Sequence, residues 1–216
     1  MLKYSSLLLF AFIFLFENIE AQSSLDSTQL KKEFVSLDEA LKNPNKVYRL
    51  NLSNQTIQIP DTIWAKFTNL EYLSLKNDHL KQVPAGIGYI KTLKVLDLSG
   101  SDFKMLPLTF GNLSNLQELF INDDKYFDLE GNIETIDKIA TLTSLHIENN
   151  GLKSLPKNIF NLHHIESLYL NNNKFKQLPT ELNKLDNLKY LDLQDNKLRQ
   201  SLRDPNNQGF RFKVNL

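Results

Sequence analysis

The sequence contains no cysteine, few glycines and no excess of either charge. The lack of Cys among 216 residues excludes disulfide frameworks, thiolate metal sites and cysteine nucleophiles. Lys plus Arg equal Asp plus Glu at 25 each, so no strong non-specific attraction to nucleic acid or to an anionic membrane is expected. A hydrophobic fraction of 41% is enough to bury a core, which excludes a disordered chain. The composition includes 40 Leu and 24 Asn but only 7 Gly, which favours an internal repeat.

Residues 1–21 have the pattern of a secretory signal peptide. Lys3 supplies a positive start, and an unbroken apolar run follows at residues 7–16. A membrane-spanning helix needs about 20 apolar residues, so this run is too short for a confident anchor. Ala21 is a small residue suited to the last position before cleavage. We therefore predict export without stable membrane insertion, to the medium, a periplasm or the cell surface; an uncleaved signal anchor is the alternative.

One apolar pattern recurs seven times within residues 47–202. In the sixth copy Leu168 and Leu170 alternate with Ser167, Tyr169 and Asn171, and this period of two predicts a short strand. One strand with one apolar face cannot form a core, so the copies are expected to stack in a parallel sheet with strands about 4.8 Å apart. The copies are spaced by 23, 23, 23, 26, 23 and 23 residues, and they begin at Val47, Leu70, Leu93, Leu116, Leu142, Ile165 and Leu188.

This pattern, Leu-x-x-Leu-x-Leu-x-x-Asn-x-Leu-x-x-Leu-Pro-x-x-Ile-x-x-Leu, resembles the leucine-rich repeat family over about 70% of the chain. The resemblance implies a right-handed α/β solenoid with a parallel sheet on its concave face and irregular or 3₁₀ segments on its convex side. It also implies protein binding in general, without pointing to a particular partner. The short period and the absence of Cys from an exported chain favour a bacterial source.

The position at which each copy turns inward is not uniform. An Asn amide can both donate to and accept from unpaired backbone groups in such a turn, whereas an ionised Asp can only accept. We therefore expect looser and less regular turns in the amino-terminal half. In chain order the seven turn residues are Gln55, Asp78, Ser101, Asp124, Asn150, Asn173 and Asn196.

Both ends of a solenoid need a cap, because an open end exposes the core. Residues 22–46 are interpreted as a polar linker followed by a capping helix, since Ser36 and Glu39 match a capping box. Residues 203–216 are interpreted as a tail with a possible capping strand; a frayed tail is the alternative. The strand signal comes from the alternating apolar residues Phe210, Phe212, Val214 and Leu216.

The fourth copy is three residues too long, and its additional residues fall within the acidic segment 123–131. Insertions in repeats form loops, and loops often carry function. A solvated acidic loop is the favoured interpretation. The segment lacks the Gly that an EF-hand requires at its sixth position, which argues against that kind of calcium site. A different ion site and a partner contact both stay open.

The residues between the inward-facing leucines should line the concave face. Phe120, His146 and Tyr169 fall in the same column on three consecutive strands, so adjacent rings are expected roughly 5 Å apart. An exposed aromatic stripe flanked by carboxylates is typical of a binding hot spot, but cross-strand packing that only stiffens the sheet is the alternative. The candidate partner-binding residues are Tyr72, Lys76, Asp97, Glu118, Phe120, His146, Glu148, Tyr169, Tyr190 and Asp192.

Catalytic and metal-binding patterns are not found in the sequence. No His-Glu-x-x-His pair or triad spacing occurs, and His146 with Glu148 offers only two of the three or four ligands that a zinc site needs. We therefore predict no enzyme activity, no cofactor and no metal. The favoured function is an exported, monomeric protein-binding module that binds no nucleic acid. The alternative is a surface or adhesive protein that binds glycans or envelope components.

Overall fold

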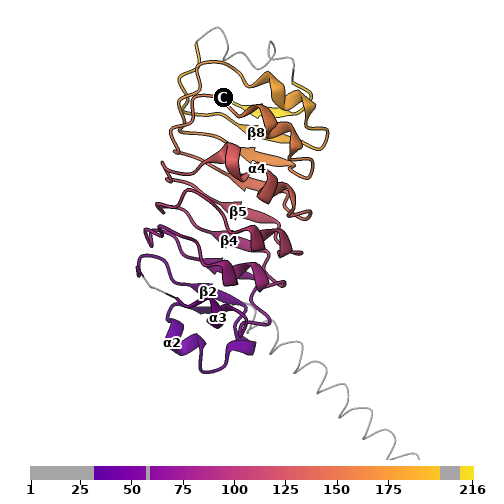
Figure 1. The fold of residues 1–216 in the computed structure, drawn as a ribbon. Coiled ribbons are helices and arrows are strands. Elements are labelled where there is room, and N and C mark those ends of the chain that lie inside the picture. Colours follow the sequence, from indigo (N-terminus) through magenta and orange to yellow (C-terminus); the bar gives the residue numbers. More distant parts are fainter. Residues whose placement is uncertain (1–31, 57–58, 200–209) are drawn as a thin grey trace, which may run out of the picture.

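The chain forms an elongated stack of short strands with turns along one edge and helical segments along the other (Figure 1). The computed structural model describes residues 32–56, 59–199 and 210–216. The signal segment 1–21 that the sequence predicts, the following residues to 31 and the last positions of the predicted repeat region, 200–202, lie outside the described residues.

A nine-stranded parallel sheet runs through the molecule in simple chain order. The middle residue of each repeat strand is a leucine, from Leu50 to Leu191, and these leucines align in one fully buried row. The predicted parallel-sheet solenoid is therefore confirmed. The strands are β1 (Glu33–Phe34), β2 (Arg49–Asn51), β3 (Tyr72–Ser74), β4 (Val95–Asp97), β5 (Glu118–Phe120), β6 (Ser144–His146), β7 (Ser167–Tyr169), β8 (Tyr190–Asp192) and β9 (Lys213–Asn215).

Short 3₁₀ helices cover the convex side, as predicted. They are η2 (Ala85–Tyr89), η3 (Leu108–Asn112), η4 (Lys157–Asn161) and η5 (Thr180–Lys184), and α3 (Asp61–Trp64) takes their place in the first copy. A proline precedes each of these segments. Proline suits this position because its φ is set near −65° and because no N–H is needed there.

The backbone at the inward turn is left-handed in all seven copies, a feature that the sequence analysis missed. Positive φ angles are rare for residues other than Gly, and Asn and Asp are the most tolerant. Four of the 24 Asn residues therefore meet a backbone requirement one position before the turn residue. The left-handed positions are Asn54, Asn77, Gly100, Asp123, Asn149, Asn172 and Asp195.

At the amino-terminal end, Ser36 caps α2 (Leu37–Ala40), and its hydroxyl accepts a hydrogen bond from the backbone N–H of Glu39 at 3.4 Å. The 3₁₀ helix η1 (Pro44–Lys46) leads from there into β2. Strand β1 lies inside the segment interpreted as a linker and pairs with β2. Two residues are too few to show a strand period, which is why the sequence did not reveal it. At the other end, β9 pairs in parallel with β8 and extends the sheet.

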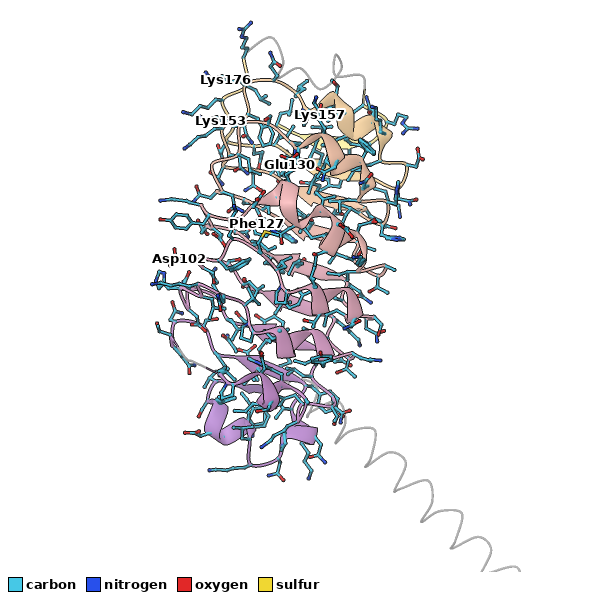
Figure 2. All side chains as sticks on the ribbon, in the orientation of Figure 1. Asp102, Phe127, Glu130, Lys153, Lys157 and Lys176 are labelled. Atoms are coloured by element: carbon cyan, nitrogen blue, oxygen red, sulfur yellow. The ribbon has the colours of Figure 1, made fainter. Side chains whose placement is uncertain are left out.

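The fourth copy differs most from prediction, because its additional residues lead into the helix α4 (Leu129–Asp137). The expectation of a solvated acidic loop is wrong for Asp124 and Phe127, of which only 1% and 8% is exposed. Asp128 caps the helix through a 3.0 Å bond from the backbone N–H of Gly131. Figure 2 labels Phe127, just before this helix, and Glu130, in its first turn; the helix packs between η3 and η4.

Candidate functional site

One column of side chains runs across the strands on the face opposite the buried leucines. Strand pairing aligns Phe120 with His146 and His146 with Tyr169, which confirms that these three residues share a column. The same column continues through Asp97 on one side and Asp192 on the other. The parallel register thus brings side chains that are 23 or 26 residues apart in sequence next to each other.

Three rings of this column form a continuous stack. The ring centroids of Phe120 and His146 are 3.9 Å apart, and those of His146 and Tyr169 are 4.0 Å apart with the planes within 5° of parallel. Tyr190 extends the stack at 5.5 Å with a tilt of 54°. Phe120 and Tyr169 are half-buried. His146 is only 8% exposed, so the expectation that it belongs to an exposed stripe is wrong.

His146 is held in this stack by two carboxylates. Its Nε2 lies 2.9 Å from Oε1 of Glu118, and its Nδ1 lies 3.4 Å from Oε1 of Glu148. A neutral imidazole has one N–H and can donate to one of the two, whereas the doubly protonated ring can donate to both. The backbone N–H of Glu148 in turn donates to the side-chain oxygen of Asn122 at 2.9 Å. These contacts hold the His146 ring in place. Phe120 and Tyr169, on either side of it, are then the rings of the stack that a partner could contact.

The carboxy-terminal end of this face is polar and hydrogen-bonded. The Tyr190 hydroxyl donates to Oδ2 of Asp192 at 3.3 Å, and Asn215 donates to the same oxygen at 3.2 Å. Burial, followed by the nearby negative charge of Asp192, raises the pKa of Tyr190, so its hydroxyl remains a donor at neutral pH. Asn215 was missed as part of the site because it lies on β9, beyond the repeats.

The amino-terminal end of the face is more basic. The Arg49 guanidinium lies 4.0 Å above the ring of Tyr72 and 3.3 Å from Oε1 of Glu33. Burial is the largest cause of the raised pKa of the Tyr72 hydroxyl. Lys76 is exposed just beyond β3. The structure therefore separates the ten predicted site residues into a central cluster of Glu118, Phe120, His146, Glu148 and Tyr169 and two flanking groups.

In the described part of the chain, no group of three or more His, Cys, Asp or Glu side chains is placed to hold a metal ion. Within the same residues, no helix is both long enough and apolar enough to cross a bilayer.

The repeated strands, turns and inward leucines define an α/β solenoid class. The chain is a leucine-rich repeat protein, and its residues 140–198 match the family model described as leucine rich repeat. It is 31% identical to mouse lumican over 124 residues, which are 54% of this chain and 36% of lumican.

Two solved structures are also similar. A leucine-rich repeat protein of Leptospira interrogans has 29% identity and a TM-score of 0.59, over 78% of this chain and 48% of that one. The plant peptide hormone receptor RGFR1, solved in complex with RGF2, has 25% identity and a TM-score of 0.51, over 71% of this chain and 25% of the receptor. The chain therefore spans less than half the length of each of these three relatives.

Proposed function

We propose that this chain is an exported protein-binding module that acts through the concave face of its solenoid and performs no catalysis. In this proposal residues 1–21 are a removed signal peptide, residues 47–202 are the binding repeats, and the segments on either side close the ends. The observation that carries the proposal is the ring stack of Phe120, His146 and Tyr169 with carboxylates on both sides.

The stack suits binding because its geometry is set before a partner arrives. Rings held by stacking and by two carboxylates lose little conformational freedom on association, which lowers the entropic cost of binding. Half-buried aromatic side chains at the centre of a face are also typical hot-spot residues. The central ring, His146, acts as a support, and Phe120 and Tyr169 provide the contact surface.

The charge around the stack indicates what kind of protein surface would fit. The Glu118 side chain is 36% exposed, and Asp97 and Asp192 lie in the same column as the rings. A partner that presents Lys or Arg beside an apolar or aromatic side chain would complement this pattern. Support also comes from the family, because leucine-rich repeat proteins commonly bind protein partners, and the similar plant receptor was solved with a bound peptide hormone.

The test replaces both outer rings with a charged residue. The variant Phe120→Asp with Tyr169→Asp should weaken partner capture at least about tenfold, since hot-spot truncations cost about 2 kcal/mol or more each. The matched control is Tyr89→Asp with Phe160→Asp, which makes the same chemical changes at exposed aromatics on convex-side segments. Photo-crosslinking from position 169 would identify the partner. Undiminished capture, or an equal loss in the control, would count against the concave face.

A second candidate is the surface or adhesive protein that binds glycans. The nearly parallel rings of His146 and Tyr169 favour it, because flat aromatic faces also suit the apolar faces of sugars. A glycan array probed with the exported chain tests this candidate. A glycan signal that the Phe120 and Tyr169 variant abolishes, without any captured protein, would favour it over protein binding.

A further inference from the structure

A groove of about 500 Å³ lies on the side of the carboxy-terminal repeats, away from the residues of the concave face. Four lysines from three consecutive copies line it, and its floor includes Leu155, Phe175 and Pro179. None of these residues belongs to the ring stack or to its carboxylates. The lysines are Lys153, Lys174, Lys176 and Lys197.

The repeat arranges these lysines in two rows. Lys153 and Lys176 occupy the same position in successive copies, and Arg199 occupies it in the next one. Lys174 and Lys197 form the second row, again 23 residues apart. Neighbouring copies stack at about the strand spacing of 4.8 Å, so each row places positive groups at short and regular steps along the solenoid axis. Figure 2 shows Lys153 and Lys176 on one edge of the molecule, which is also the edge that carries Asp102.

These charges have little compensation. Across residues 32–56, 59–199 and 210–216, no ion pair within 4.0 Å involves any of the four lysines. By contrast, Lys94 pairs with Glu71 at 3.0 Å and Lys189 pairs with Glu166 at 2.7 Å. Glu181 is the one acidic side chain that lines the groove, so the lining carries a net charge of +3. The whole sequence is neutral, so this positive charge is a local concentration.

We infer that this lysine groove binds a linear polysaccharide that carries carboxylate or sulfate groups along its length. The two rows run along the solenoid axis, which suits a polymer with regularly spaced negative charges. Lysine acts as a mobile point charge, whereas bidentate recognition of a single carboxylate or phosphate favours arginine. The lining therefore fits attraction to distributed charge better than capture of one anionic group.

The floor of the groove argues against two other polyanions. Leu155 and Phe175 are only 7% and 1% exposed and Leu178 is half-buried, so the groove offers little apolar surface on which an acidic peptide could anchor a side chain. Nucleic acid would need accessible rings on which bases stack. Among the described residues that line the groove, the one aromatic ring is that of Phe175, which is buried. Ser154 and Gln177 are exposed at the groove, where they could hydrogen-bond to sugar hydroxyls.

The test measures binding of the exported chain to heparin, which is sulfated, and to polygalacturonate, which is carboxylated. Poly-L-glutamate represents an acidic peptide, and dextran serves as the uncharged comparison. Both anionic polysaccharides should bind at low salt. Their affinity should fall steadily as the salt concentration rises, because binding releases counterions from the polysaccharide and this release is less favourable at high salt. The groove variant combines Lys153→Gln, Lys174→Gln and Lys176→Gln and should weaken binding about tenfold or more.

Two control variants distinguish an effect of the groove lysines from an effect of the protein's total charge. Lys66→Gln, Lys91→Gln and Lys125→Gln remove the same charge at exposed positions outside the groove and should change binding less than about twofold. Arg at the three groove positions keeps the charge and should retain binding.

Three outcomes would count against the groove, and a fourth separates it from the concave face. Failure of both polysaccharides to bind at low salt, or an equal loss in the two Gln variants, overturns the inference. Tighter binding of poly-L-glutamate than of either polysaccharide also overturns it, in favour of an acidic protein ligand. The double Asp variant at positions 120 and 169 should bind the polysaccharides normally, so this outcome is separate from that of the concave face.

Discussion

The inward turns of the carboxy-terminal and amino-terminal copies share a left-handed residue just before the turn position but differ in their hydrogen bonding. In the carboxy-terminal half, the side-chain oxygen of Asn173 accepts from the backbone N–H groups of Asn150 and Leu152 at 3.1 and 2.9 Å. Its amide nitrogen donates to the carbonyls of Ile147 and Leu170 at 2.9 and 3.0 Å. Every polar atom of this buried side chain therefore has a partner.

In two of the four amino-terminal copies a carboxylate, Asp78 or Asp124, stands in the same place. Oδ1 of Asp78 accepts from the backbone N–H groups of Gln55 and Thr56 at 2.9 and 3.4 Å, as the Asn oxygen does in later copies. Its Oδ2 is buried and has no hydrogen-bond partner among the described residues. An ionised carboxylate has no proton to donate, so the neighbouring carbonyl that an amide would reach is left without this donor. We therefore expect the copies with Asp to be the less stable ones.

Asp124 in the fourth copy shows this weakness most clearly. Its Oδ1 accepts from the backbone N–H of Tyr126 at 3.1 Å, but its Oδ2 is buried and lacks a partner within the described part of the chain. Burial raises the pKa of Asp124 from 3.8 to about 6. We therefore expect the carboxylate, which has an oxygen atom where an amide has its NH₂ group, to make this turn sensitive to pH.

The substitution Asn173→Asp, which puts the Asp of the amino-terminal copies into a carboxy-terminal turn, is expected to change the stability most. The change removes the hydrogen bonds that the amide donates to the carbonyls of Ile147 and Leu170 in a site that is only 3% exposed, and it buries a carboxylate. We expect the free energy of unfolding at pH 7 to fall by about 2–3 kcal/mol, measured by urea denaturation. Asn172→Asp is the matched control, because that side chain is exposed and only its left-handed backbone matters. An equal loss in both variants would show that the amide bonds are not what stabilises the turn.

The next effect is a gain of stability from Asp124→Asn. The new amide would reach the Leu98 carbonyl, which corresponds to the Ile147 carbonyl that Asn173 contacts. We expect a gain of about 1–2 kcal/mol at pH 7, measured in the same way.

The pH dependence of that gain follows from the raised pKa. Because the folded pKa of Asp124 lies above its unfolded value, protonation favours the folded state, and this contribution is lost as the pH rises through about 6. The difference between Asp124→Asn and the unchanged chain should therefore be small near pH 4 and grow up to pH 7. A difference that does not vary with pH would contradict the role of Asp124.

The smallest effect is expected from Asp78→Asn. Burial raises the pKa of Asp78 as well, but three backbone N–H groups and the nearby His79 oppose the shift. We expect a gain of up to about 1 kcal/mol at pH 7, read from the midpoint of thermal or urea unfolding. A loss of stability would mean that this turn requires the negative charge of Asp78. The amino-terminal and carboxy-terminal turns would then be stabilised by different interactions.

The sequence predicted the structural features that recur in every copy, but it did not predict those that depend on contacts within a single copy or between two neighbouring ones. The columns on the concave face follow from a period of two within strands and 23 between them, and strand pairing confirms them. The burial of His146 was missed, because it depends on how Glu118 and Glu148 converge on one ring from two different strands. The helix α4 was missed because the segment before it reads as acidic, and only packing against η3 and η4 reveals the buried side chains.

The sequence by itself determined the solenoid, its sheet and the columns of side chains on its face, because a repeated apolar pattern can be buried in one way only, by stacking copies. The tertiary structure alone decided which members of those columns are accessible and which polar atoms find partners. Stacking brings each side chain next to one from another copy, and only the close contact of these neighbours decides whether a buried ring or carboxylate is satisfied.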